Sequence, residues 1–201
     1  MQLRGFFADN FGNWHLLHQH LPDGGLRYRT PLIQYKILMG EPFVLGINEG
    51  ADILQQIFPE ITHLKVGTEE YDITEKRLFI RTDEFGTTAD FIPYAFLTPW
   101  LALNQENYEA YQKYGSWQKR RELLSKILVG NILSIAKGIN YTVTEPITVK
   151  FDHLRETRTT LKGTPMLGFL GDFQINFAIP EYWGIGKSVA RGFGTIARCS
   201  W

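Results

Sequence analysis

Short runs of apolar residues, separated by glycine, proline and other turn-forming residues, mark the first half of the chain. Residues 32–38 and 42–47 are rich in apolar residues, and the short connection between them, Met39-Gly40-Glu41, indicates a hairpin. After the hairpin, apolar residues recur at helical spacing as far as Pro59, which ends the predicted helix. The other elements predicted in this half are a strand at residues 2–8, a short helix at residues 14–21 and two strands within residues 62–82.

The second half begins at a polar, turn-rich stretch, residues 83–93, which we interpret as a boundary. Asn104 is placed to cap a helix that runs to about Gly138, with Gly115 and Gly130 as candidate break points. The segments that follow are strand-like: residues 147–154, 155–161 and 165–179, with turns predicted at Lys162-Gly163 and Gly171-Asp172, and a last element at residues 192–198.

Both halves therefore fit α+β units with few helices and mainly antiparallel strands. The order of elements in each half is compatible with a ferredoxin-like unit. The fold class predicted from the pattern is α+β.

Composition and charge add few constraints. The chain has 201 residues, of which 44% are hydrophobic, enough to bury the core of one large domain or two small ones. Lysine plus arginine and aspartate plus glutamate both number 21, so a nucleic-acid partner would need a local basic face. No apolar run reaches the roughly 18 residues that cross a membrane, and we recognise no signal peptide. With Cys199 as its one cysteine, the chain is expected in the cytoplasm and away from membranes.

The tripeptide Gly186-Lys187-Ser188 raises the question of a nucleotide-binding P-loop. That motif requires a glycine at position 181, which is glutamate, and a helix after the serine, where only 13 residues remain. The dinucleotide fingerprint also fails, because its third glycine falls at Val189. We therefore exclude both nucleotide motifs.

The motif that remains is a pair of Gly-x-Gly sequences separated by five residues. Glycines can bring backbone N–H groups close to phosphate oxygens, or they can serve only turns with positive φ, and glycine content alone leaves both open. The candidate RNA-binding residues in this segment are Gly184, Gly186, Lys187, Arg191, Gly192 and Gly194.

The complete spacing, ending in Gly192-Phe193-Gly194, resembles the glycine-rich loop of the RAMP superfamily of RNA-binding proteins. His18-Gln19-His20, followed by YRTPLIQYK at residues 28–36 and GINEG at residues 46–50, resembles the CRISPR-associated endoribonucleases that cut precursor CRISPR RNA within its repeats. The form associated with type I-B systems is the most similar.

This resemblance implies two tandem ferredoxin-like domains with antiparallel sheets, at residues 1–85 and 86–201. It implies metal-independent cleavage that leaves a 2′,3′-cyclic phosphate and a 5′-hydroxyl, with no cofactor. The implied partner is CRISPR repeat RNA, and association with other CRISPR effector subunits or as a homodimer stays open. The alternative is a non-catalytic RAMP subunit that holds CRISPR RNA in an effector complex.

Histidine suits the acid and base of such a reaction, because its pKa lies near neutrality. In an extended segment His18 and His20 would point to one face, about 6–7 Å apart, whereas in a helix His15 and His18 would pair. The family's catalytic histidines carry over onto His18 and His20. Tyr28 is a candidate for orienting them or sharing proton transfer, and Lys36 for stabilising charge. The rival for this cluster is a zinc site, which lacks an identified fourth ligand.

Basic residues near the C-terminus supply candidate contacts to RNA phosphates. Arg155 and Arg158, with Lys162, lie on a predicted strand and turn. A second basic cluster comprises Lys119, Arg120 and Arg121. Runs of charge of this kind also occur on faces that only meet solvent.

Overall fold

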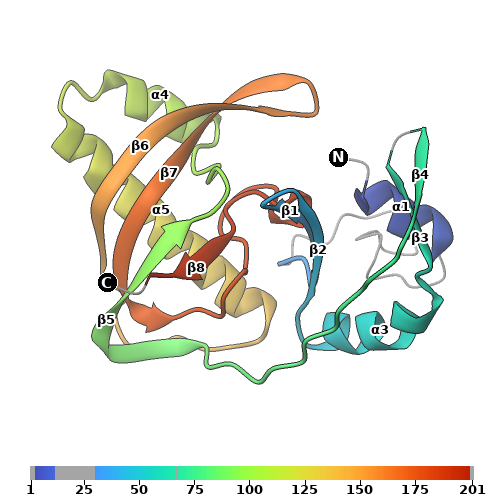
Figure 1. The fold of residues 1–201 in the computed structure, drawn as a ribbon. Helices are drawn as coiled ribbons and strands as arrows, with labels where there is room; N and C mark the ends of the chain where they lie inside the picture. The colour runs from blue at the N-terminus through green and yellow to red at the C-terminus, as the bar shows by residue number, and fades with distance from the viewer. Residues whose placement is uncertain (1–2, 12–29, 67, 200–201) are drawn as a thin grey trace, which may run out of the picture. The chain divides into compact units, whose positions relative to one another are not determined.

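The computed structural model describes residues 3–11, 30–66 and 68–199, and Figure 1 shows their elements. The chain divides into two compact units. Unit 1 comprises Met1–Thr82 together with Ala190–Gly192, and unit 2 comprises Asp83–Val189 together with Phe193–Trp201. No helix in the described part of the chain is long and apolar enough to cross a membrane.

The described residues of unit 1 form two helices and two antiparallel hairpins. Its elements are α1 (Leu3–Asn10), β1 (Ile33–Leu38), β2 (Glu41–Gly46), α3 (Glu49–Ile57), the 3₁₀ turn η1 (Phe58–Glu60), β3 (His63–Val66) and β4 (Glu69–Asp72). β1 pairs with β2, and β3 pairs with β4. Met39 and Gly40 form the first turn with φ of 51° and 86°, the two positive values that a tight hairpin turn requires. The predicted hairpin and the helix before Pro59 are both confirmed.

The strand predicted at residues 2–8 is wrong, because residues 3–8 belong to the helix α1. Its apolar residues Leu3, Phe6 and Phe7 are spaced i, i+3 and i+4, so a helix places all three on one face. That face joins Ile33 and Tyr35 of β1 in one hydrophobic core, completed by Ile53 and Ile57 of α3. Val44 of β2 and Leu64 of β3 pack against the same core, although β2 and β3 do not pair with each other.

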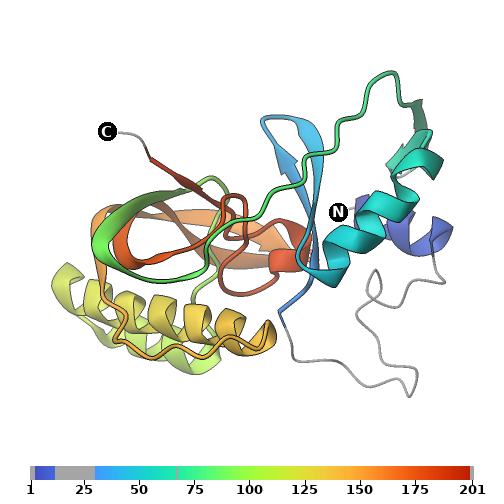
Figure 2. The same cartoon turned by 90° about the horizontal axis from the view of Figure 1, so that it is seen from below.

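The described residues of unit 2 form a four-stranded antiparallel sheet and two helices. Its elements are β5 (Gly86–Phe96), α4 (Gln105–Lys113), α5 (Trp117–Gly138), β6 (Val149–Leu161), β7 (Thr164–Ala178), the 3₁₀ turn η2 (Val189–Arg191), which continues into unit 1, and β8 (Ile196–Arg198). The strand order is β6-β7-β5-β8. Figure 2 shows the two helices on one face of this sheet.

The strand order of unit 2 is that of a ferredoxin-like unit. β7 pairs antiparallel with both β5 and β6, so β5 and β6 are parallel, joined through α4 and α5 with β7 between them. The second crossover, from β7 to β8, contains the glycine-rich segment and η2 where a ferredoxin-like unit has a helix. The predicted fold class, α+β with antiparallel sheets, is confirmed.

The turn-rich stretch at residues 83–93 begins where the two units divide, and its residues from Gly86 onward form the first part of β5, whose register shifts between Thr87 and Ile92. The helical region of unit 2 needs correction. The predicted single helix is two helices, because the chain breaks at Gly115 and Ser116 caps α5 through its hydroxyl. Asn104 caps α4 as predicted, accepting a 2.7 Å hydrogen bond from the Asn107 amide. Gly130 lies inside α5 and does not break it.

The β6–β7 hairpin is longer than predicted. β6 runs unbroken through both of the strands expected at residues 147–161, and Lys162-Gly163 forms the predicted turn. The second predicted turn, at Gly171-Asp172, is wrong, since β7 continues through it. Gly171 has φ of 137° and sits opposite Leu154, beside a register shift between Phe151 and His153. The glycine therefore serves a bulge inside the sheet.

Candidate functional site

Most of the predicted catalytic residues lie outside the described residues. This holds for His18, His20 and Tyr28, and also for His15, on which the zinc alternative depends. Their roles stay predictions. Lys36 is the predicted catalytic residue that the structure describes.

Lys36 is buried in β1, in which the four residues from Ile33 to Lys36 are buried on both faces of the strand. Ile33 and Tyr35 face the core, and Gln34 and Lys36 alternate with them, at 0% and 2% exposure. The Lys36 ammonium donates a 2.9 Å hydrogen bond to Oε1 of Gln34. Burial lowers the pKa of Lys36 from 10.5 to about 7. Near neutral pH this amine is therefore able to hold or release a proton.

Two glycines of the glycine-rich segment are required by packing. Gly186 has φ of 91°, and a Cβ there would lie 2.6 Å from Nε1 of Trp100. Gly194 has φ of 63°, and a Cβ there would collide with the Ile185 carbonyl. The Ile185 N–H also donates a 2.9 Å hydrogen bond to the Gly194 carbonyl, so the two residues are held close together. Positive φ and close contact thus account for both residues. Their contact with RNA stays a prediction.

The rest of this segment does not resemble a nucleotide-binding loop. Gly184 bridges to Thr195, and Lys187 is exposed, with its amide bonded to the Leu101 carbonyl at 3.2 Å. After Ser188 comes η2, a three-residue turn in place of the helix that a P-loop requires.

Gly192 belongs to unit 1, where it lies against β1. It has φ of 84°, and a Cβ there would lie 3.0 Å from the Tyr35 carbonyl oxygen and 3.2 Å from Cα of Lys36. This close approach brings the neighbouring Arg191 into unit 1 as well. Burial and the positive charge of Arg191 lower the pKa of Arg4. The sequence did not suggest Arg4, because it is 187 positions from Arg191 (191 minus 4).

Arg155 and Arg158 are both exposed on β6, but they do not share a face. Arg155 pairs with Leu170 and Arg158 with Leu167, and residues three apart along a strand point to opposite sides. Arg158 is on the same side as Glu156, whose carboxylate accepts a 2.7 Å hydrogen bond from Tyr111 of α4. Arg155 is on the opposite, helix-free side.

In the second basic cluster, two arginines connect α5 with β6. Arg120 lies 3.5 Å from the Glu156 carboxylate and stacks over the Tyr111 ring, and Arg121 donates to the Asp152 carbonyl at 3.1 Å. Lys119 is exposed. Packing therefore explains Arg120 and Arg121 without a ligand.

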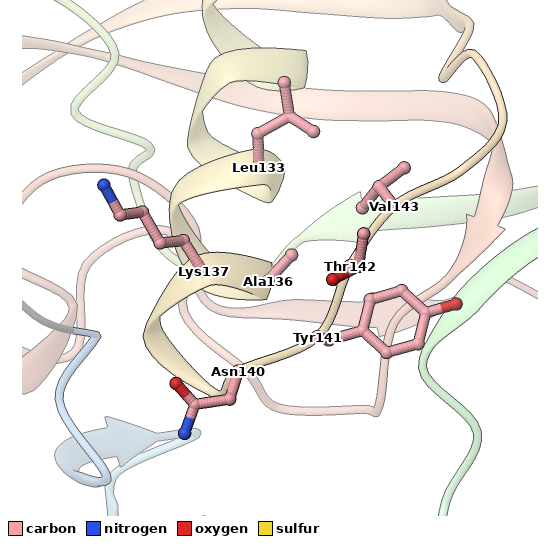
Figure 3. Close-up of a pocket in the computed structure, with 7 residues that line it drawn as sticks. All are labelled: Leu133, Ala136, Lys137, Asn140, Tyr141, Thr142 and Val143. Carbon is pink, nitrogen blue, oxygen red and sulfur yellow. The ribbon is translucent and has the colours of Figure 1, made fainter.

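A shallow pocket lies at the C-terminal end of α5 in unit 2 (Figure 3). Its lining has one lysine, one tyrosine and no histidine or carboxylate, so it lacks an acid–base pair. The lining residues are Leu133, Ala136, Lys137, Asn140, Tyr141, Thr142 and Val143.

Comparison with known proteins identifies the family. A profile of the Cas6b N-terminal domain matches residues 1–84, and a profile of the Cas6b C-terminal domain matches residues 86–199. A solved structure described as Cas6b is 38% identical with a TM-score of 0.92, and the match covers 98% of this chain and 90% of that one.

Two further relatives match at similar identity. A solved structure described as the CRISPR RNA processing endoribonuclease Cas6b is 36% identical with a TM-score of 0.75, covering 98% of this chain and 89% of that one. An uncharacterized protein from Methanocaldococcus jannaschii is 38% identical over 143 residues, which are 71% of this chain and 97% of that protein. The family predicted from the histidine and glycine motifs is therefore confirmed, and the chain belongs to the Cas6b family.

Proposed function

We propose that this protein is an endoribonuclease that cuts precursor CRISPR RNA within its repeats. The observation that carries the proposal is the match over 98% of the chain, at 36% identity, to a structure described as a CRISPR RNA processing endoribonuclease. Lys36, a buried amine with a pKa of about 7 in the strand next to the predicted catalytic segment, supports it.

The proposed reaction is an internal transfer at the scissile phosphate. A general base takes the proton of the 2′-hydroxyl, and the 2′-oxygen attacks phosphorus. The bond from phosphorus to the 5′-oxygen breaks, and a general acid protonates that oxygen. The products are a 2′,3′-cyclic phosphate and a 5′-hydroxyl, and the reaction uses no metal. His18 and His20 are the proposed acid and base, Tyr28 orients them, and Lys36 stabilises charge on the phosphorane.

RNA binding is assigned to the glycine-rich segment and to the β6–β7 hairpin. Lys187 and Arg191 flank the tight turns of the segment, and Arg155 and Arg158 lie exposed on β6. The positive charge of all four side chains attracts a phosphate backbone, although the chain as a whole has no net charge.

The experiment is incubation with repeat RNA in EDTA, beside RNA with a 2′-deoxy group at the cut site. We expect cleavage of the first RNA and none of the second. Loss of cleavage in EDTA would point to zinc, and tight binding without cleavage would point to a non-catalytic RAMP subunit. His18→Ala with His20→Ala should abolish cleavage and largely spare binding, and normal cleavage by this variant would refute the assignment of the histidines.

A further inference from the structure

Two residues of unit 1, Arg4 and Tyr35, have no part in the reaction described above. Arg4 interacts with the charge of Arg191, and Tyr35 lies against Gly192, the residue after Arg191. We propose that Arg4, Arg191 and the Tyr35 hydroxyl form a site for one phosphate of the RNA backbone. This inference rests on the proposed function, since it names where the RNA strand is held.

The three residues come from separate elements that pack together in unit 1. Arg4 is in the first turn of α1, and Phe7, one turn later, lies against the Tyr35 ring with the ring centres 5.3 Å apart. Gly192 rests on the backbone of Tyr35 and Lys36, which places Arg191 at the same strand. Arg4 is close enough to both Arg191 and Tyr35 for their charges to interact.

Two guanidinium groups held this close repel each other. Both arginines are half-buried, and burial together with the charge of Arg191 disfavours the charged form of Arg4. An anion between them would relieve the repulsion and would also meet the positive N-terminal end of the helix. A phosphate suits this position because guanidinium groups bind its oxygens through paired hydrogen bonds.

The Tyr35 hydroxyl supplies an independent reason for a ligand. Tyr35 is 2% exposed, and its hydroxyl has no hydrogen-bond partner within the described part of the chain. Buried hydroxyls are seldom left without a partner, because the group loses its bond to water on burial. A phosphate oxygen at Arg4 and Arg191 would accept a hydrogen bond from it.

The position of the site favours an RNA phosphate over free phosphate. Lys36, which we assign to the cleavage reaction, directly follows Tyr35 in β1, and Arg191 belongs to the glycine-rich segment. A nucleotide strand that passes these residues carries a phosphate at every step, so the site would hold a phosphate near the cut.

The test measures binding of repeat RNA with a 2′-deoxy group at the cut site, by fluorescence anisotropy at several salt concentrations. Arg4→Ala should weaken binding about tenfold and lower the slope of log affinity against log salt by about one. Arg4→Ala with Arg191→Ala should lose less than the product of the two single losses, since both residues hold the same phosphate. The matched control is Arg77→Ala, an exposed arginine of unit 1 that pairs with Glu75.

Tyr35→Phe separates binding from folding. It removes a buried hydroxyl without a partner, so it should raise the melting temperature of the RNA-free protein while weakening RNA binding a few-fold. If the hydroxyl had only a structural role, Tyr35→Phe would change the melting temperature and the RNA affinity in the same direction.

A second arm uses inorganic phosphate and the melting temperature of the RNA-free protein. Phosphate should stabilise the wild type more than Arg4→Ala. Equal behaviour of Arg4→Ala and Arg77→Ala in both arms would overturn the site, and a phosphate effect without any loss of RNA affinity would overturn its role toward RNA. If the wild type binds no repeat RNA, the proposed function fails, and the phosphate arm alone decides whether the anion site exists.

Discussion

The Lys36 ammonium lies 2.9 Å from Oε1 of Gln34, and both side chains are buried in β1. A lysine inside a protein costs stability, because the charged form loses its hydration. The cost is tolerated here in the strand that follows the predicted histidine segment, as expected of a group retained for chemistry.

Lys36→Met should remove a pH dependence of stability. The pKa of Lys36 is about 7 in the folded chain and 10.5 in the unfolded chain, so between these values the unfolded state binds more protons. The penalty for burying the amine is therefore complete below pH 7 and declines as pH rises toward 10.5. We expect Lys36→Met to be more stable than the wild type by about 3–5 kcal/mol below pH 7, with the difference vanishing near pH 10.5.

Urea unfolding at pH 6.5, 8.5 and 10 measures this difference. Burial raises the pKa of Tyr35, so the stability that its protonated hydroxyl contributes declines above pH 10. This decline occurs in the wild type and in Lys36→Met alike, and it cancels in their difference. The control is Lys65→Met, an exposed lysine of β3. A constant difference between wild type and Lys36→Met across the range would contradict the prediction.

The two hairpin arginines should differ in their effect on RNA binding. Arg155 lies on the helix-free side of β6, whereas Arg158 shares the side of Glu156 and α4. A strand of RNA on the open side contacts Arg155 directly, whereas Arg158 attracts it only through its charge, from the other side of the strand. We expect Arg155→Ala to weaken binding of uncleavable repeat RNA about five- to tenfold and Arg158→Ala less than twofold. Equal losses in anisotropy titrations would show that RNA surrounds the hairpin.

Prediction from sequence succeeded where the determining contacts are local. The β1–β2 hairpin has its strands and its turn in one continuous segment, and the Asn104 cap needs only the next turn of helix. It failed for α1, because Leu3, Phe6 and Phe7 were assigned to a strand although their spacing also fits a helix.

Elements and sites made by distant residues were not predictable. β5 has a polar beginning, and it is a strand because it pairs with β7, whose partner residues lie 77 to 92 positions further along the chain (Ala95 with Asp172, Gly86 with Ala178). Gly171 predicts a turn when only its own segment is considered, and its place inside a strand follows from its pairing with β6. In the candidate site, Lys36 was predicted from a family motif. Arg4 and Tyr35 were not predicted, because their role depends on Arg191, which the fold brings into unit 1 from the other end of the chain.

Gly194→Ala should destabilise unit 2 through contact as well as backbone strain. Gly194 has φ of 63°, and an added Cβ would collide with the Ile185 carbonyl. Gly163, with φ of 82°, has open space around it, so Gly163→Ala measures the strain alone. We expect losses of about 1 kcal/mol for Gly163→Ala and above 2 kcal/mol for Gly194→Ala. Equal losses in urea unfolding would remove the packing explanation for Gly194.

Tyr111→Phe should loosen the attachment of α4 to β6. The Tyr111 hydroxyl donates a 2.7 Å hydrogen bond to Glu156, and Arg120 stacks on its ring. Removing the hydroxyl should cost about 1 kcal/mol, because Glu156 is partly exposed and regains water.

The effect of Tyr111→Phe should also depend on pH. Burial, together with the hydrogen bond and the charge of Glu156, raises the pKa of Tyr111 above its ordinary 10.0. A raised pKa gives stability that is complete below pH 10 and is lost at higher pH, so the wild type should lose its advantage over Tyr111→Phe above pH 10. Thermal unfolding at pH 8 and pH 10.5 measures this change, with Tyr108→Phe, an exposed tyrosine of the same helix, as the control. If Tyr108→Phe matches Tyr111→Phe at both pH values, the bond to Glu156 contributes nothing to the stability of unit 2.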